Sequence, residues 1–340
     1  MADTDVLVVG GGPVGLAAAI EARRHGLDVV VVEPRPGTVD KACGEGLMPG
    51  AMALLREWDV DPAGHPITGI SYRSPAGHVD HRFRGTAGRG VRRTTLHDAL
   101  RERAADLGAV TVARRVEDVR TVPGGVVAGG VSARYLLACD GLHSTVRRRL
   151  GLEAPATARP GRRRYGLRRH YRLAPWTDLV EVHWSPVAEA YVTPVAPDLV
   201  GVALLGPRGA DLTAALAALP ELAERLDGAT AGPVRGAGPL RQRSTRRTAG
   251  PVRLVGDASG YVDALTGEGL RVGFAQARAA VATLDDPAGY ERAWWAATRD
   301  YRVLTSGLVA WASSPLRGAL VPTARRLPGV FGAVVERLAR

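Results

Sequence analysis

The chain has 340 residues, a formal net charge of +11 and only two cysteines, Cys43 and Cys139. This length is enough for two joined domains with a large apolar core. The basic residues are arginines apart from Lys41, and no DNA-reading motif accompanies them, so the composition does not indicate a nucleic-acid-binding protein. Two cysteines so far apart exclude a disulfide framework and a zinc site, and no metal is expected.

No apolar run approaches the roughly 20 residues of a membrane span, and no signal peptide precedes the first predicted strand. The sequence therefore predicts a cytoplasmic protein whose contact with a membrane is at most peripheral.

The first predicted element is a strand over residues 6–9, whose continuous apolar sequence is typical of burial on both faces. It leads directly into Gly10, Gly12 and Gly15, a G-x-G-x-x-G pattern that opens an Ala-rich helix. The first glycine permits a tight turn, the second lets the backbone approach a pyrophosphate, and the third lets the helix pack closely on the strand. The turn therefore predicts a dinucleotide site at the helix N-terminus.

A second apolar run, residues 27–32, ends in Glu33. An acidic side chain at the tip of this strand accepts hydrogen bonds from ribose hydroxyls, which favours an unphosphorylated ribose, as in FAD or NAD. The glycine pattern alone also occurs in other α/β proteins, and these two segments do not separate FAD from NAD.

Two later segments each place polar residues after an apolar run. They supply Asp140, Gly141, Ser144 and Arg147 in the middle of the chain, and Gly256 and Asp257 near residue 255. With the glycine-rich turn, and in this order, these residues resemble the motifs of FAD-dependent oxidoreductases of the para-hydroxybenzoate hydroxylase-like superfamily. That superfamily includes class A flavin monooxygenases, halogenases and geranylgeranyl reductases, and the resemblance covers most of the chain.

The resemblance implies an α/β fold with a Rossmann-like FAD-binding domain, an antiparallel-sheet substrate domain and C-terminal helices. The implied FAD-binding domain comprises residues 1–70, 89–158 and 250–285. The substrate domain comprises 71–88 and 159–249, and a helical cap comprises 286–340.

The resemblance also implies the contacts with FAD. An arginine before the helix 96–107 lies along the phosphates, and Arg93 is preferred to Arg92. The carboxylate of Asp257 accepts from the ribityl chain, and the glycine-rich start of a helix that ends near Leu284 faces the pyrimidine edge of the flavin. The full set is Gly10, Gly12, Pro13, Val14, Gly15, Glu33, Pro34, Arg35, Cys43, Gly44, Arg93, Val116, Asp140, Gly141, Ser144, Arg147, Gly256, Asp257, Gly267, Glu268, Gly269 and Leu270.

The loop over residues 40–49 resembles that of geranylgeranyl and menaquinone side-chain reductases more than that of phenol hydroxylases. The candidate catalytic residues lie in this loop and are Cys43, Glu45 and Gly46. A thiol beside a flavin serves as a proton donor or a polarizable contact. The alternative is that Cys43 is a small buried residue of a glycine-rich loop, and Cys139 is expected to fill the core.

Between the second and third FAD segments, short strands are predicted over 166–173, 179–185, 190–195 and 199–205, followed by a helix over 212–226. Alternate side chains of these strands are expected to line the substrate pocket, but the sequence does not give the phase of the alternation. The candidates are Tyr165, Leu167, Arg169 or His170, His183 or Trp184, and Tyr191 or Thr193.

Residues 301–340 mix apolar residues and arginines between prolines. Plain helices covering the core are expected there, and the alternatives are a cap over an apolar tunnel or a surface that contacts a membrane.

The resemblance implies a monooxygenase of secondary metabolism that hydroxylates or epoxidises a small apolar or aromatic substrate through a flavin C4a-hydroperoxide. The first alternative is a reductase of isoprenoid C=C bonds, and the second is a non-redox cyclase or binding protein. NAD(P)H is the expected transient reductant. Because no second G-x-G-x-x-G is present, it binds over the flavin, or a separate electron donor replaces it.

Overall fold

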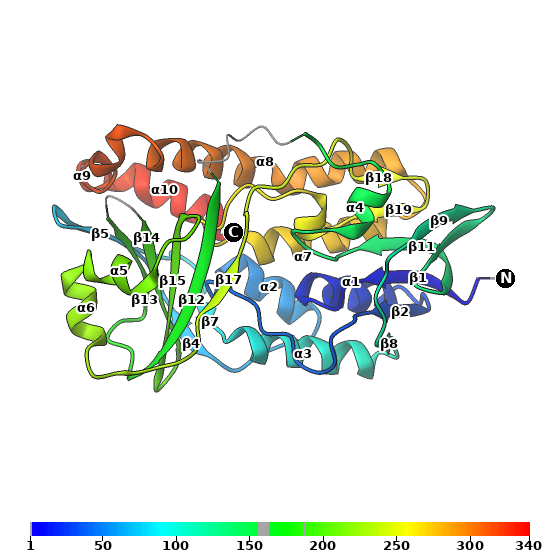
Figure 1. The fold of residues 1–340 in the computed structure, drawn as a ribbon, viewed down its shortest axis with the longest axis horizontal. Helices are drawn as coiled ribbons and strands as arrows, with labels where there is room; N and C mark the ends of the chain where they lie inside the picture. The colour runs from blue at the N-terminus through cyan, green and yellow to red at the C-terminus, as the bar shows by residue number, and fades with distance from the viewer. Residues whose placement is uncertain (1, 156–162, 186–187) are drawn as a thin grey trace.

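The computed structural model describes residues 2–155, 163–185 and 188–340. Two large sheets lie at opposite ends of the molecule, and the long helix α8 (Pro287–Ala312) runs alongside both (Figure 1). The N-terminus lies at the outer end of the first sheet, and the C-terminus lies near the middle of the molecule. The two sheets therefore meet around a central region that elements from the whole chain enclose.

The first sheet has the order β18-β19-β11-β1-β2-β8, and β9 and β10 extend it beside β11. Its central strands are parallel and rich in valine because both of their faces are buried. The strands are β1 (Thr4–Val9), β2 (Val29–Val32), β8 (Val110–Val112), β9 (Val119–Val122), β10 (Gly125–Ala128), β11 (Val131–Ala138), β18 (Thr248–Ala249) and β19 (Val252–Leu254).

One face of this sheet is covered by helices whose small residues allow close packing. The alanines of α1 (Pro13–Arg24) are buried against α7 (Gly269–Ala282) and α3 (Arg93–Asp106). Helix α2 (Pro49–Glu57) packs on α7, where Trp58 meets Phe274 edge to face with ring centroids 5.5 Å apart. The short elements α4 (Thr145–Arg149) and η2 (Gly256–Ser259) follow β11 and β19. Their positions place the second and third motifs at the carboxyl edge of the sheet, next to the glycine-rich turn.

The second sheet has the order β16-β12-β15-β14-β13-β5-β6, with β17 beside β12. It is antiparallel except for the parallel pair β5 and β13, which joins residues 69–74 to this sheet. Its strands are β5 (Gly69–Ser74), β6 (Gly77–Arg82), β12 (Arg164–Arg172), β13 (Leu179–Trp184), β14 (Glu189–Ala196), β15 (Leu199–Pro207), β16 (Thr230–Ala231) and β17 (Arg235–Ala237). A small sheet of β3 (Gly46–Leu47), β7 (Gly88–Gly90) and β4 (His65–Ile67) lies between the two large ones.

The strand register decides which side chains of the second sheet face the first domain. Arg168 pairs with Ala203, and Ala203 pairs with Tyr191, so these three residues share one face. Val182 pairs with Tyr191 and continues that face. The opposite face packs on α5 (Leu212–Ala217) and α6 (Pro220–Leu226). The sequence did not show which alternate side chains face the first domain. The register of the paired strands decides this.

The prediction of one continuous helix over 212–226 is wrong. The chain forms two helices, α5 and α6, and Pro220 occupies the first turn of the second. Proline has no backbone N–H and its ring obstructs the preceding turn, so a helix restarts there more easily than it continues.

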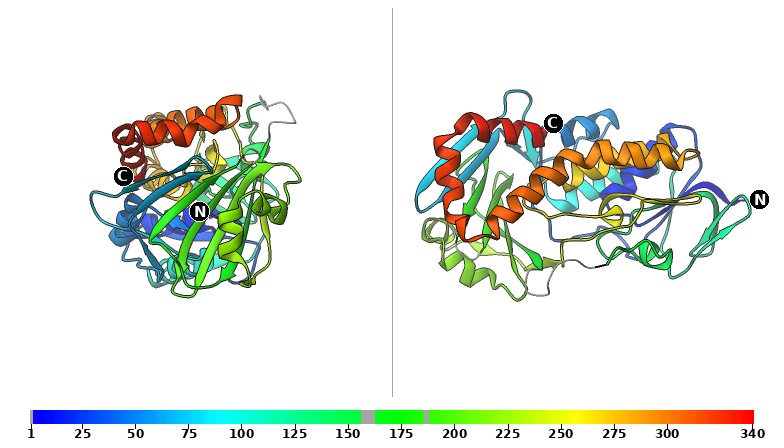
Figure 2. Two further views of the ribbon diagram at one scale, coloured as in Figure 1. Left: turned by 90° about the vertical axis from the view of Figure 1, so that its left-hand side faces the viewer. Right: turned by 90° about the horizontal axis from the view of Figure 1, so that it is seen from above.

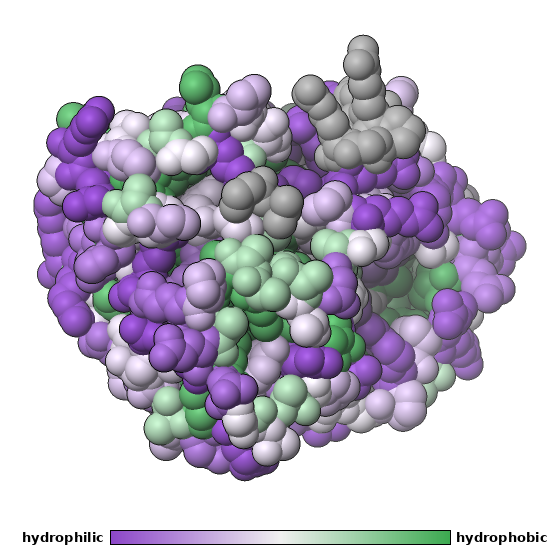
Figure 3. Space-filling view, turned by 60° about the vertical axis from the view of Figure 1, so that its left-hand side comes forward, coloured by the Kyte–Doolittle hydropathy of each residue, from purple (hydrophilic) through white to green (hydrophobic). Residues whose placement is uncertain are grey.

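The C-terminal region folds into helices that cover one side of the second sheet. Helix α8 is followed by η3 (Pro315–Ala319), α9 (Leu320–Arg326) and α10 (Pro328–Ala339), and α9 and α10 pack on β6 (Figure 2). In the part of the chain that the structure describes, none of the helices is long and apolar enough to span a membrane. On the face drawn in Figure 3, hydrophobic residues gather only in small patches among hydrophilic ones.

Candidate functional site

The glycine-rich turn has the geometry that a dinucleotide phosphate site requires. Gly10 has φ of 103°, a conformation that strongly favours glycine. A Cβ on Gly15 would lie 1.8 Å from the carbonyl oxygen of Gly10, so only glycine lets α1 begin this close to β1. Pro13 occupies the first turn of α1, where no partner for its nitrogen is needed. The N–H groups in the first turn of this helix are therefore available to a ligand beside Gly12.

Glu33 lies at the tip of β2, directly beside the turn. Its Oε2 accepts a hydrogen bond from the Gly11 N–H at 2.9 Å, and its Oε1 accepts from Arg35 Nε at 2.7 Å. Burial opposes ionisation of Glu33, but these hydrogen bonds outweigh burial and lower its pKa. Glu33 is thus a fixed carboxylate at the position expected to bind ribose hydroxyls, and Pro34 is exposed beside it.

The mid-chain motif, residues 140–147, mainly holds neighbouring segments of the site together. Asp140 Oδ2 accepts from the backbone N–H groups of Thr145 and Val146, at 2.7 and 3.1 Å, while its buried Oδ1 has no partner among the described residues. Ser144 caps α4 by accepting from the Arg147 N–H at 2.9 Å. The fully buried guanidinium of Arg147 donates to the carbonyl oxygen of Ala258 at 3.0 Å. Arg147 therefore holds the second motif to the third, while the free Asp140 oxygen remains an acceptor for a ligand.

Asp257 and Lys41 come from different segments and lie close enough for their charges to interact. The Asp257 carboxylate makes no hydrogen bond to any described residue, and burial raises its pKa, although Lys41 and Arg93 oppose that effect. Burial also lowers the pKa of Lys41, and the positive charges of Arg35 and Arg93 lower it further. An anion beside these three cations would relieve their mutual repulsion.

These observations fit FAD. Cations from three segments lie around the glycine-rich turn. The space beside Gly12 is open, because a Cβ there would meet only Arg93 Nη2, at 3.8 Å. Carboxylate oxygens without a hydrogen-bond partner among the described residues remain at Asp140 and Asp257. Arg93 lies beside the turn, whereas Arg92 occupies the N-cap position of α3. The phosphates would lie on the helix N-terminus and cations, and the ribityl hydroxyls would bind Asp257.

A chain of buried polar groups connects this cradle to the second sheet. Glu45 has φ of 60° and is nearly fully buried, and its Oε1 accepts from the Arg93 N–H at 2.9 Å. Its Oε2 lies 2.6 Å from His170 Nε2, and Arg168 Nη1 lies 2.9 Å from His170 Nδ1. Because a guanidinium only donates, His170 must accept at Nδ1 and donate from Nε2 to Glu45. Arg168 also pairs with Asp40.

We expect His170→Ala to raise the FAD dissociation constant about tenfold, since a lost buried hydrogen bond to a charged group is worth about 1.5–3 kcal/mol. Glu45 would lose the partner that orients it, and through Glu45 the start of α3 and Arg93 would become less fixed. Titration of the apoprotein with FAD, followed by quenching of flavin fluorescence, measures this effect.

His183→Ala is the matched control. His183 is also buried and donates to a carboxylate, with its Nε2 2.9 Å from Glu181 Oε2, but it lies on the opposite face of the second sheet. It should lower stability and leave FAD affinity unchanged. Equal losses of FAD affinity in the two variants would contradict the role assigned to His170.

Cys43 and its neighbours lie at the junction of the two domains. Cys43 Sγ accepts a hydrogen bond from the Glu45 N–H at 3.4 Å, and burial raises the pKa of the thiol. Thr193 on β14 donates to the carbonyl oxygen of Gly44 at 2.8 Å, and Gly46 begins β3. Cys43 is thus a protonated thiol in a loop that the second sheet holds in place.

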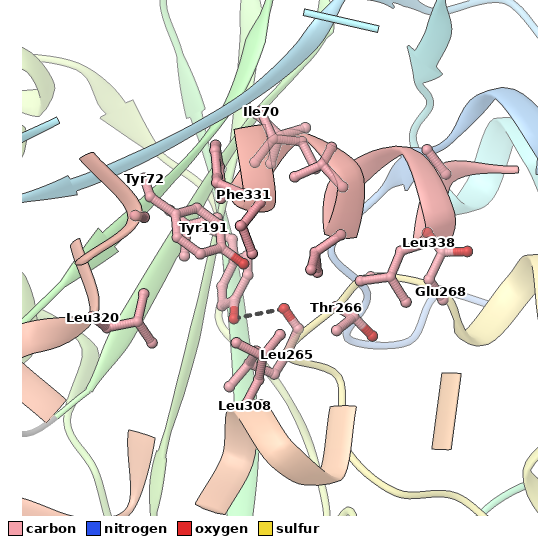
Figure 4. A pocket seen from close by; sticks show the side chains of 18 of the residues that line it. Ile70, Tyr72, Tyr191, Leu265, Thr266, Glu268, Leu308, Leu320, Phe331 and Leu338 are labelled. Atoms are coloured by element: carbon pink, nitrogen blue, oxygen red, sulfur yellow. Dashed lines mark hydrogen bonds between the residues drawn. The ribbon is translucent and has the colours of Figure 1, made fainter. Parts of the chain in front are cut away.

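An apolar cavity of about 170 Å³ lies between the second sheet and the C-terminal helices. Its walls include Ile70 and Tyr72 of β5, Leu308 of α8, Leu320 of α9 and Phe331 of α10 (Figure 4). The rings of Tyr72 and Phe331 lie 4.9 Å apart between centroids. The C-terminal helices therefore form a cap over an apolar pocket. This arrangement corresponds to the cap over an apolar tunnel, one of the two alternatives stated for residues 301–340.

Few polar groups reach this cavity. Tyr191 donates its hydroxyl hydrogen to the carbonyl oxygen of Leu265 at 3.0 Å, so this hydroxyl is already engaged (Figure 4). Thr266, Gly267 and Glu268 close one end, where Glu268 lies next to Leu338. Glu268 is nearly fully buried, and its Oε2 accepts from Arg271 Nε at 2.5 Å. Burial raises the pKa of Glu268 to about 7, despite the opposing effect of Arg271.

The structure places the other predicted residues in several ways. Gly267 has φ of 72° with open space beside it, Gly269 begins α7, and Val14 packs between Gly256 and Gly273. Val116 is buried in an apolar cluster, and Leu270 packs on the main core. Of the strand candidates, Tyr191 lines the apolar cavity, Thr193 and His170 contact the 40–46 loop, and Tyr165 and Leu167 lie at a different hollow beside β17.

The sequence prediction did not include four residues that the structure places in or beside the cradle, which are Asp40, Lys41, His97 and Arg168. His97 lies 2.9 Å by its Nε2 from the Gly11 carbonyl oxygen and supports the glycine-rich turn. Lys41, as the only lysine of the chain, was the one detectable signal. Within the described ranges, no cluster of three or more His, Cys, Asp or Glu side chains has a metal-binding arrangement.

Comparison with known proteins supports an FAD binding domain in this chain. Residues 3–164 match the family model of an FAD binding domain. A menaquinone reductase of Mycobacterium tuberculosis is 37% identical over 164 residues, which cover 43% of this chain and 40% of that protein. A rifampicin monooxygenase of Rhodococcus hoagii is 34% identical over 164 residues, which cover 43% of this chain and 33% of the relative. The matched region thus spans less than half of each of these relatives.

The fold of nearly the whole chain is also found among solved structures. A flavin-dependent brominase, solved as a triple mutant, superposes with a TM-score of 0.81 at 17% identity, covering 99% of this chain and 94% of that structure. The superposed 99% of the chain includes both sheets and the helical cap, whereas the family model covers residues 3–164. Residues 3–164 are therefore an FAD binding domain, and the chain as a whole has the fold of the flavin-dependent brominase.

Proposed function

We propose that this protein is an FAD-dependent oxidoreductase that acts on an apolar substrate, and that it reduces a C=C bond of that substrate. The observation that carries the proposal is the cavity under the helical cap, which is apolar along its walls and has one ionisable carboxyl group at the end where α7 begins. Bound FAD would supply the two-electron redox chemistry. The chain's own residues would hold the substrate, exclude water and provide the proton.

The lining supports an apolar substrate because it has few groups with which to bind a charged or strongly polar one. The Tyr191 hydroxyl is engaged with a backbone carbonyl, and burial raises the pKa of Tyr72 to about 12, so this side chain is neutral at physiological pH. Leu327 and Val330, both exposed, lie at the edge of the cavity and would meet the part of the substrate nearest to solvent.

Monooxygenation is the second candidate function. Its support is the similarity to rifampicin monooxygenase. A cavity closed by apolar walls suits oxygen transfer as well as reduction, because both reactions need water to be excluded.

An anaerobic experiment separates these functions. The FAD-loaded protein is photoreduced and mixed with menaquinone-4 or geranylgeraniol as apolar probes, and flavin absorbance and product mass are followed. We expect the flavin to be reoxidised without oxygen and the probe to gain two hydrogens. A product that forms only after oxygen is added, with the mass of one more oxygen atom, would support monooxygenation. No product under either condition would contradict both redox functions and favour a non-redox role.

A further inference from the structure

Among the described residues that line the cavity, Glu268 is the acidic one, and its position suits proton transfer. Glu268 lies at the junction of two features: it closes one end of the apolar cavity, and it immediately precedes α7, whose N-terminus lies beside the third cofactor motif. Residues 266–268 therefore border the substrate space and lead directly into the helix assigned to the cofactor. A substrate atom that reacts with the cofactor must come close to this segment.

From this placement we propose that Glu268 is a catalytic acid that gives a proton directly to the substrate at the inner end of the cavity. The inference rests on the proposed function and extends it to a specific residue. Reduction of a C=C bond adds one hydride, supplied by the reduced cofactor, and one proton. The O–H bond of the Glu268 carboxyl group breaks, a C–H bond forms on the substrate, and the carboxylate later regains a proton from solvent.

The local contacts allow Glu268 to hold and release a proton. Within the described part of the chain, Arg271 is its only hydrogen-bond partner, and this bond engages Oε2. Oε1 has no hydrogen-bond partner among the described residues, and the Glu268 residue lines the cavity. The Arg271 ion pair stabilises the carboxylate left after proton transfer, whereas burial stabilises the protonated acid. These two effects bring the pKa of Glu268 close to the pH at which the protein works, as general acid catalysis requires.

The other walls bring no competing charge to Glu268. The ionisable side chains from β5 and β14 are Tyr72 and Tyr191, and burial raises the pKa of both, so they stay neutral. Arg340 lies beside Gly50 and the Arg271 side chain, and Arg271 is the one charged side chain that shifts the pKa of Glu268 among the described residues. A pH dependence between 5.5 and 8.5 at this end of the cavity is therefore assigned to Glu268.

The first test measures the ionisation of Glu268 without turnover. Octylamine, which is cationic throughout this pH range, should bind the FAD-loaded protein about tenfold more tightly at pH 8.5 than at pH 5.5, because its ammonium group pairs with the ionised carboxylate. Octan-1-ol, of equal length and uncharged, should bind equally at both pH values. Glu268→Gln should abolish the pH dependence for octylamine, whereas Glu57→Gln, an exposed acid on α2, should keep it.

The second test measures catalysis. In protein saturated with FAD, Glu268→Gln should lower the rate of anaerobic flavin reoxidation by a reducible probe at least 100-fold at pH 7, and Glu268→Asp should restore part of the rate. An unchanged rate in Glu268→Gln would overturn the proposal while the proposed function stands. A pH dependence of octylamine binding that persists in Glu268→Gln would also overturn it. A third outcome is that the wild-type protein reduces no probe while Glu268→Gln still abolishes the pH dependence of octylamine binding. That result would contradict the reductase function and the catalytic role of Glu268, and it would support only the titration of Glu268 in the cavity.

Discussion

Glu189→Ala is expected to lower the free energy of unfolding by about 3–5 kcal/mol, because it leaves buried charges without their partner. Glu189 is fully buried on β14, where Oε2 lies 2.7 Å from Arg164 Nη2 and Oε1 lies 2.8 Å from Arg317 Nη2. Arg164 also pairs with Asp263, at 2.9 Å from Nε to Oδ2. This group joins the second sheet, the C-terminal cap and the loop that leads to Glu268, so its loss affects all three.

Urea denaturation followed by circular dichroism measures this change. Glu221→Ala is the control, since Glu221 is an exposed carboxylate that also pairs with two arginines, Arg73 and Arg225. Exposed pairs contribute at most about 1 kcal/mol, so a much smaller loss is expected there. If both variants lose the same stability, the buried group does not hold the cap and the sheet together as argued.

Gly15→Ala is expected to raise the FAD dissociation constant at least tenfold and to lower the free energy of unfolding by about 1–3 kcal/mol. The added methyl group would lie 1.8 Å from the Gly10 carbonyl oxygen and 3.2 Å from the Cys139 side chain. The start of α1 would have to move away from β1, and the N–H groups at the helix end would then no longer face the phosphates. FAD titration and thermal denaturation of the apoprotein measure the two effects separately.

Gly307→Ala is the matched control for this substitution. Gly307 lies inside α8, is exposed, and has no atom within 4 Å of the position that a Cβ would take. Alanine favours a helix interior over glycine by about 1 kcal/mol, so this variant should be slightly more stable and should bind FAD normally. Normal FAD binding by Gly15→Ala would refute the close approach of helix and strand as the reason for glycine.

Much of the FAD cradle could be predicted because its determinants are local in the sequence. An apolar run, three glycines at fixed spacing and an acidic residue after the next run are enough to specify β1, the turn, α1 and the end of β2. The four main strands of the second sheet were likewise predicted to within two residues at each end, because apolar alternation and turn residues mark them. The roles of the individual cradle residues toward FAD stay predictions.

The residues that join the domains could not be predicted in the same way. Glu45 and His170 are 125 positions apart, and nothing in either local sequence indicates that they meet at 2.6 Å. Glu268 was predicted as a cofactor contact from its motif, but its burial at the end of an apolar cavity depends on β5, β14 and α10 together. The single lysine was noticed, yet its position beside Arg35 and Arg93 emerged only from the fold.

The sequence by itself determined the FAD-binding turn, because this turn depends on residues close together in the chain. Only the tertiary structure decided which face of the second sheet looks toward the cofactor, since strand pairing sets that phase and a shift of one residue would reverse it. It also decided that the C-terminal helices close an apolar cavity. The ionisation of Glu268 follows from that enclosure, because burial is a property of everything packed around a group and not of its neighbours in sequence.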